Sequence, residues 1–142
     1  MTHIRTADLD RDYAAVLAVW RAAEPGVHVG QSDTPEALRL KLTRDPELFL
    51  VAENAGRLVG AVLGGFDGRR GLVYHLAVVP EARGQGLGSA LMDELERRLR
   101  ALGCVKGYLL VVPENQAVLD WYARRGWNVM NVYALGKALD QA

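Results

Sequence analysis

Apolar residues recur along this chain with two kinds of spacing, and these spacings predict its helices and strands. Apolar positions three and four residues apart mark one face of a helix, whereas short, nearly continuous apolar runs are typical of buried strands. The predicted helices span residues 13–24, 34–45, 86–102 and 116–125. The predicted strands span residues 2–6, 48–53, 57–66, 72–79, 105–112 and 127–135.

The clearest helix, residues 86–102, stands between two strongly apolar strands, 72–79 and 105–112, which we expect to be buried. A strand–helix–strand crossover makes its two strands parallel neighbours, whereas the short turns between the earlier strands make those antiparallel. The order β-α-α-β-β-β-α-β-α-β therefore predicts a mixed α/β fold. We expect a largely antiparallel sheet with one central parallel pair, helices on both faces, and a single domain over residues 1–142.

Composition limits the function without naming it. The 142 residues carry 17 basic and 17 acidic side chains, so no overall field favours nucleic acid or a membrane, and any anion site must be local. A single cysteine, Cys104, excludes an internal disulfide and a Cys-rich zinc site, and we expect no metal. The N-terminus has no signal-peptide pattern, and no apolar run approaches the roughly 20 residues of a membrane span. We therefore expect a cytoplasmic protein.

The stretch best suited to bind an anion runs from Arg83 to Ser89, between a buried strand and a helix. Gly84, Gly86 and Gly88 lack Cβ atoms, so the backbone there can bring several N–H groups to one point. Together with the helix N-terminus these groups predict a phosphate site, and Arg83 can neutralise some of the same oxygens. Two other phosphate motifs fail, because there is no Gly-Lys-Ser/Thr and the third glycine of G-x-G-x-x-G would fall at Ser89.

With these residues the chain resembles the GNAT superfamily of N-acetyltransferases. The pattern Arg83-x-x-Gly86-x-Gly88, after a strand that reads Leu-x-Val-x-Pro, is similar to the family's acetyl-CoA signature. A second motif of the family resembles Asn115, Ala117, Trp121-Tyr122 and Arg125-Gly126-Trp127. The stretches 49–53 and 64–71 are similar to the small, stand-alone YpeA-type members. The resemblance covers nearly the whole chain in element order.

This resemblance implies transfer of the acetyl group of acetyl-CoA to a primary amine, by direct attack in a ternary complex. A bulge near Ala77 and Val78 would splay the parallel pair, and the exposed peptide groups would bind the pantetheine arm and polarise the thioester carbonyl. Asn115 would contact the arm, and Tyr122 would protonate the departing thiolate. The coenzyme-binding residues that we expect are Leu76, Ala77, Val78, Arg83, Gly84, Gln85, Gly86, Leu87, Gly88, Ser89 and Asn115.

The general base stays open at this stage, because strand 72–79 carries no Asp or Glu. His75, Glu114 and a chain of water molecules are the alternatives, and the ordinary pKa of histidine suits the task. Strand alternation predicts that Tyr74 and His75 point to opposite faces, so that at most one of them faces the acceptor. Acceptor specificity should come from residues 20–33 and the turn 67–71, with Trp20 in the core.

Two other functions remain open from the sequence alone. One is a catalytically silent module that binds or senses acyl-CoA, and the other is a nucleotide-binding fragment. No residue shows whether the acceptor is a small molecule or a protein amine. The oligomeric state is open as well, and a homodimer is possible.

Overall fold

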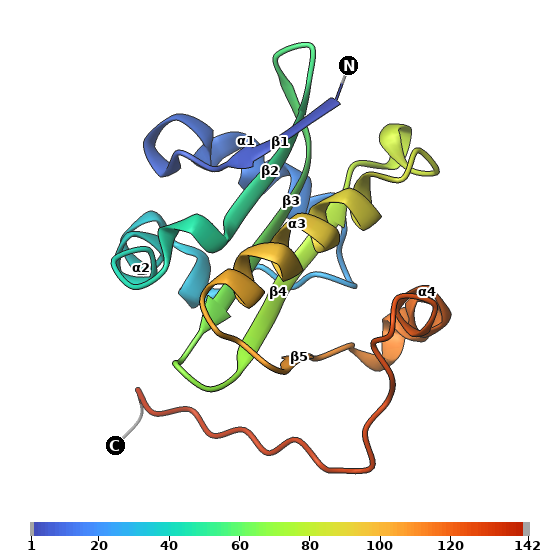
Figure 1. The fold of residues 1–142 in the computed structure, drawn as a ribbon. Helices are drawn as coiled ribbons and strands as arrows, with labels where there is room; N and C mark the ends of the chain where they lie inside the picture. Colours follow the sequence, from blue (N-terminus) through green and yellow to red (C-terminus); the bar gives the residue numbers. More distant parts are fainter. Residues whose placement is uncertain (1, 141–142) are drawn as a thin grey trace. The chain divides into compact units, whose positions relative to one another are not determined.

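The computed structural model describes residues 2–140 and divides the chain into two compact units, with the boundary between Leu110 and Val111. The N-terminal unit contains one five-stranded sheet in the order β1-β2-β3-β4-β5 (Figure 1). All neighbours are antiparallel except β4 and β5, which are parallel. The strands are β1 (Thr2–Thr6), β2 (Phe49–Asn54), β3 (Arg57–Phe66), β4 (Gly71–Val78) and β5 (Gly107–Leu109).

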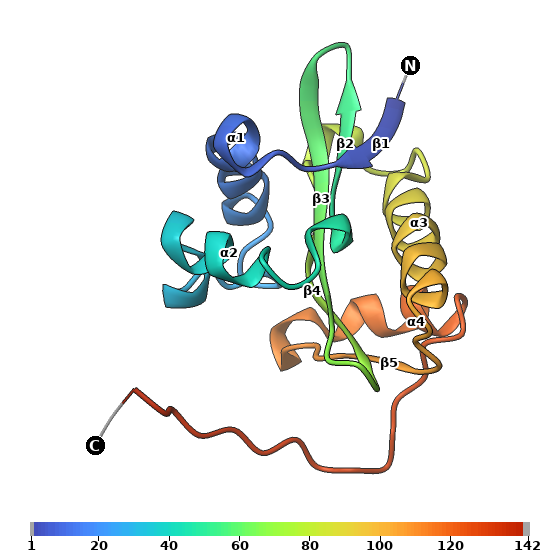
Figure 2. The same cartoon turned by 60° about the vertical axis from the view of Figure 1, so that its left-hand side comes forward.

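Helices cover both faces of this sheet (Figure 2). Helix α1 (Leu9–Arg21) packs on β3 and β4 and also contacts α2 (Pro35–Lys41), whereas α3 (Leu87–Ala101) packs on the opposite face against β2, β3 and β4. Three short 3₁₀ turns complete the unit, and they are η1 (Gln31–Asp33), η2 (Pro46–Leu48) and η3 (Pro80–Ala82). The fold class that the sequence predicts is therefore confirmed.

Local sequence signals explain where these helices begin and which side they bury. The Asp8 carboxylate accepts from the backbone N–H groups at the start of α1, and Thr34 Oγ1 accepts from Ala37 N at 3.1 Å at the start of α2. The predicted apolar stripe of α3 is buried, including Leu87, Leu91, Leu95 and Leu99. On the other side of the sheet Trp20 is fully buried, as the sequence predicts.

Strand β4 contains a bulge that positions the site. Leu63 of β3 faces Tyr74 and Ala61 faces Ala77, so the two residues His75 and Leu76 oppose the single residue between Ala61 and Leu63. The expected bulge is thus present, but it lies at His75 and Leu76 rather than at Ala77 and Val78. His75 takes a φ of 52°, which is uncommon for a residue with a side chain.

Three predictions about strands and their burial are wrong. Of the predicted strand 105–112 only β5 forms. Val105 and Leu110, which lie on either side of β5, are more than four-fifths exposed. The strand 127–135 does not form, which leaves the parallel pair at the edge of the sheet among the described residues. An apolar run becomes a strand only where its backbone groups find partners, and propensity alone does not supply them. Strand β4 is not buried on both faces, because Leu72 and Tyr74 are exposed.

The C-terminal unit holds the 3₁₀ segment η4 (Pro113–Val118) and α4 (Leu119–Ala123). The helix predicted over 116–125 is therefore shorter, and its N-cap residue is Val118, because Asn115 lies within η4 (φ −112°, ψ 28°) and not next to α4. Gly126 follows α4 with a φ of 87°, which fits its expected role as a helix stop. None of the helices described in residues 2–140 has the length and apolar character that crossing a membrane requires.

Candidate active site

The segment after β4 forms an exposed loop that ends at the first turn of α3. Gly84 and Gly86 adopt left-handed backbone conformations, with φ values of 79° and 80°. A Cβ atom at either position would meet nothing within 4 Å, so glycine is required there for its backbone conformation and not for lack of space. Gly86 is the N-cap residue of α3. It offers no side-chain acceptor to the first backbone N–H groups of the helix.

Two arginines set the charge around this loop. Arg83 Nε donates to the backbone oxygen of Val78 at 3.0 Å, which ties the loop to the end of β4 and holds a positive charge beside it. Arg57 hydrogen-bonds Glu81, and this contact lowers the pKa of Glu81. Because Glu81 is neutralised by Arg57, the acid in the loop opposes a bound anion less strongly.

The edge of β4 next to the loop offers backbone groups as well. Pairing of β4 with β5 ends at Val73 and Leu109, whereas β4 continues to Val78. In the part of the chain that the structure describes, no strand pairs with this edge from Tyr74 onward. Leu76, Ala77 and Val78 therefore lie at an edge where peptide groups can bind an extended ligand, apart from the Val78 oxygen, which accepts from Arg83.

A cavity of about 700 Å³ lies beside β4, between the sheet, α2 and η1. Its walls include both Tyr74 and His75, so the prediction that these two residues point to opposite faces is wrong. The bulge is the physical reason, because the extra residue interrupts the two-residue alternation of the strand. Burial, with a smaller effect from Asp45, raises the pKa of the Tyr74 hydroxyl.

His75 is hydrogen-bonded to a buried carboxylate that the sequence did not identify. His75 Nε2 lies 3.1 and 3.0 Å from the two carboxylate oxygens of Asp33, which is 5% exposed. Asp33 Oδ2 also accepts from Gly30 N at 3.0 Å, and the imidazole meets the Trp20 ring edge-on at 4.8 Å. Asp33 falls in the segment 20–33 expected to contact the acceptor, but no motif marks it.

A second buried carboxylate in this cavity, Asp45, has a different set of partners. It is hydrogen-bonded by the Lys41 ammonium, which also donates to the Gly64 backbone oxygen, and it accepts from Phe66 N at 2.8 Å. Asp45 therefore has a cationic partner of its own and holds α2 against the end of β3.

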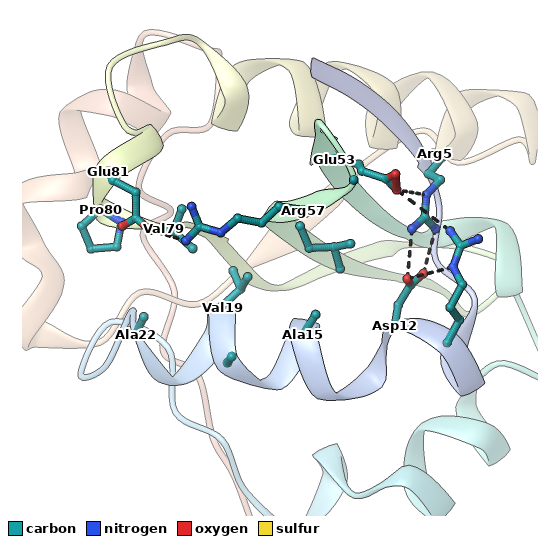
Figure 3. Close-up of a pocket in the computed structure, with 14 residues that line it drawn as sticks. Arg5, Asp12, Ala15, Val19, Ala22, Glu53, Arg57, Val79, Pro80 and Glu81 are labelled. Carbon is teal, nitrogen blue, oxygen red and sulfur yellow. Dashed lines mark hydrogen bonds and ion pairs between the residues drawn. The ribbon is translucent and has the colours of Figure 1, made fainter. Parts of the chain in front are cut away.

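A further cavity of about 810 Å³ lies between α1 and the β2–β3 hairpin (Figure 3). Two hydrogen bonds of 2.7 and 2.9 Å join Arg5 to the Asp12 carboxylate, and a third of 2.8 Å joins Arg5 to Glu53. The hydrogen bond from Arg5 lowers the pKa of Asp12 to about 2. The charged groups drawn in Figure 3 pair with one another, which is typical of structural ion pairs.

The predicted site residues Glu114, Asn115 and Tyr122 belong to the C-terminal unit. Burial raises the pKa of Tyr122 to about 12, and its ring meets Trp121 edge-on at 5.0 Å. The Arg125 guanidinium lies 3.7 Å from the centroid of the Trp121 ring. Glu114 is exposed in η4, one residue before Asn115.

A mixed sheet with helices on both faces and a glycine-rich helix start after β4 defines a GNAT-like fold. The chain belongs to the acetyltransferase (GNAT) family, whose pattern matches residues 14–127 and so spans the boundary between the two units. The family predicted from the sequence is thereby confirmed, and with it the class of enzyme. A single domain over residues 1–142 stays a prediction.

Individual relatives agree with this assignment. An acetyltransferase of Pectobacterium atrosepticum is 40% identical over 128 residues, covering 90% of this chain and 89% of the relative. One from Yersinia enterocolitica is 39% identical over 128 residues, with the same two shares covered. Among solved structures, the PaiA N-acetyltransferase of Thermoplasma acidophilum in complex with coenzyme A superposes with a TM-score of 0.76 at 19% identity, covering 94% of this chain and 93% of that one.

Proposed function

We propose that this protein transfers the acetyl group of acetyl-CoA to a primary amine. The observation that carries the proposal is the start of α3, where the cap residue Gly86 offers no side-chain acceptor and follows the left-handed Gly84. Backbone N–H groups at such a helix start favour phosphate oxygens, and Arg83 adds a positive charge. The coenzyme complex of the similarly folded PaiA enzyme supports this choice of ligand.

The residues of this segment suit the coenzyme. The N–H groups of residues 83–89 would hold the pyrophosphate, with space above both left-handed glycines. The edge of β4 at Leu76, Ala77 and Val78 would hydrogen-bond the pantetheine arm, with one N–H directed at the thioester oxygen. On the basis of the sequence motif, we assign to Asn115 a further contact with the arm.

The reaction forms one C–N bond, breaks one C–S bond and moves one proton from the amine to the thiolate. His75 would accept the amine proton, with Glu114 or water as the alternative acceptor. Tyr122 would donate a proton or a hydrogen bond to the departing thiolate. Because burial raises the pKa of Tyr122 to about 12, this phenol is protonated at neutral pH and acts first as a hydrogen-bond donor. Full proton transfer requires a thiolate that is desolvated as well, since an ordinary thiol has a pKa near 8.5, about three units lower.

Calorimetry of the folded protein with acetyl-CoA tests the coenzyme site. We expect saturable binding, weakened about 10- to 100-fold in Arg83→Gln through the loss of a charge-assisted contact. Arg69→Gln, in the exposed β3–β4 turn, is the matched control and should bind like the wild type. Absence of heat at high coenzyme concentration would contradict the proposal, and binding of ATP or NAD in place of acetyl-CoA would indicate a nucleotide site.

A panel of primary amines with detection of released thiol tests the transfer. It should include small amines and peptides with free N-termini or lysines, because the acceptor is open between these classes. Thiol release that depends on one amine class supports the enzyme. Tight acetyl-CoA binding without release across the panel would favour the catalytically silent sensor. A homodimer and a cytoplasmic location remain predictions from the sequence.

A further inference from the structure

His75 is fixed from two directions, by its backbone and by its ring. The bulge gives its backbone a φ of 52°, a conformation that is uncommon outside glycine and is often found at functional sites. Its ring is held between the Trp20 indole and the Asp33 carboxylate, and its side chain is still 20% exposed and lines the cavity. The imidazole is therefore oriented on one side and accessible on the other.

The contact with Asp33 determines which ring nitrogen carries the proton. Both oxygens of Asp33 lie within 3.1 Å of Nε2, and an ionised carboxylate only accepts hydrogen bonds. Nε2 must then be the protonated nitrogen of the neutral ring, which leaves the lone pair on Nδ1. Asp33 is itself fixed, because Gly30 N donates to its carboxylate and the Tyr13 hydroxyl donates to its backbone oxygen at 2.8 Å.

We propose that Asp33 is a positioning residue that holds His75 with hydrogen on Nε2, so that Nδ1 accepts the proton of the acceptor amine. This inference rests on the proposed function and deepens it. As the C–N bond forms, the amine proton passes to Nδ1, and the resulting imidazolium is stabilised by the carboxylate of Asp33. The proton then leaves to solvent, which restores the neutral ring, and the departing thiolate takes up a proton, so that in net one proton passes from the amine to the thiolate.

Other charged groups face the same cavity, and one of them offers an internal control. The titratable groups that line it besides the pair are His28, Lys41, Arg44, Asp45, Asp67 and Tyr74. Asp45 matches Asp33 in burial, at 3% exposed against 5%, but it is bonded to Lys41 and not to the imidazole. Asp67 is occupied at the rim by the backbone N–H groups of Arg69 and Arg70.

The first experiment measures the ring itself and needs no acceptor. Nitrogen NMR of the histidine-labelled protein above pH 8 should show His75 with hydrogen on Nε2 and a bare Nδ1. In Asp33→Asn the side-chain amide can donate to Nε2, so we expect the hydrogen to move to Nδ1. Asp45→Asn should leave the spectrum of His75 as in the wild type. A wild-type ring that carries its hydrogen on Nδ1 would overturn the proposal even if no variant folds.

The second experiment uses an amine found in the panel above. Asp33→Asn should lower kcat by about 10²- to 10³-fold with little change in acetyl-CoA affinity, and Asp45→Asn should not.

A double mutant shows whether Asp33 acts through His75. His75→Asn keeps a residue type that tolerates the left-handed backbone, and in this background Asp33→Asn should have no further effect on kcat. Additive losses would overturn the proposal, because Asp33 would then act without the imidazole. Failure of acetyl-CoA binding in the calorimetry would refute the proposed function, whereas an incorrect ring tautomer would refute only the role of Asp33.

Discussion

The end of β4 and the bulge within it carry the two halves of the candidate site, and the halves are built in different ways. Beyond Val78 the proposed coenzyme half is a continuous stretch of chain, and its proposed ligands are backbone N–H groups near the left-handed Gly84 and Gly86. At His75 the acceptor half consists of side chains brought together by packing, and its buried carboxylate comes from a residue 42 positions earlier. The first half therefore depends on local backbone conformation, and the second depends on the tertiary fold.

The largest effect is expected from a change in the backbone of the coenzyme half. Gly86→Val places a β-branched residue at a φ of 80°, which such residues avoid, so the loop must change conformation. Loss of two phosphate contacts of roughly 1.5–3 kcal/mol each would weaken acetyl-CoA binding about 10³-fold. Calorimetry measures this loss, and the His75 nitrogen spectrum should be unchanged because the acceptor half is built separately.

Gly56→Val provides the matched control for that variant. Gly56 has nearly the same φ, 79°, and also has open space around a Cβ, but it lies in the β2–β3 turn. Both substitutions should lower the melting temperature, since the strain is similar at about 1–3 kcal/mol. Equal affinity for acetyl-CoA in the two variants would show that the loop after β4 does not hold the coenzyme.

A smaller effect is expected at Tyr122, whose proposed task is on the coenzyme side of the reaction. Tyr122→Phe removes the hydroxyl and keeps the ring, so kcat should fall about 10²-fold while acetyl-CoA affinity changes little. Because the pKa of Tyr122 is raised to about 12, its ionisation should cause no basic limb in the pH profile below about pH 11. Single-turnover thiol release measures both effects, and an unchanged kcat would remove Tyr122 from the mechanism.

Much of the fold could be predicted from the sequence, whereas the assignment of the coenzyme-binding residues stays a prediction. The order of helices and strands through α3 follows from periodicity, and the glycine loop can be recognised because glycines stand at every second position, Gly84, Gly86 and Gly88. Asp33 could not be found in this way, since its role depends on a bulge that turns His75 toward η1. Strand alternation fails at the same point, because a bulge of one residue has no signal in the apolar pattern.

The C-terminal third is where pattern and structure diverge most. Residues 127–135 form a mostly apolar run, which predicts a strand, yet Tyr133 and Leu135 are almost fully exposed and no strand forms there. Pairing partners decide whether such a segment becomes a strand, and the short β5 offers few. The match to the family model still extends into this region, up to Trp127.

The smallest effect on activity is expected from a change at Asp12, a third buried carboxylate. The same change should clearly affect stability. It tests whether burial alone is enough to identify a functional acid. The pKa of Asp12 falls from 3.8 in a model peptide to about 2 in the folded protein, chiefly through its hydrogen bonds to Arg5. A carboxylate with a depressed folded pKa stabilises the protein above pH 4, and this contribution is lost as the pH falls from about 4 to 2. It amounts to roughly 2 kcal/mol in the free energy of unfolding.

Asp12→Asn should remove that pH dependence in denaturant titrations and leave acetyl-CoA binding and kcat unchanged. Asp10→Asn, on the same helix with an exposed side chain, should change stability by less than about 0.5 kcal/mol. A fall in kcat for the folded Asp12→Asn protein would mean that the cavity of Figure 3 takes part in catalysis, and the distinction between Asp12 and Asp33 would fail.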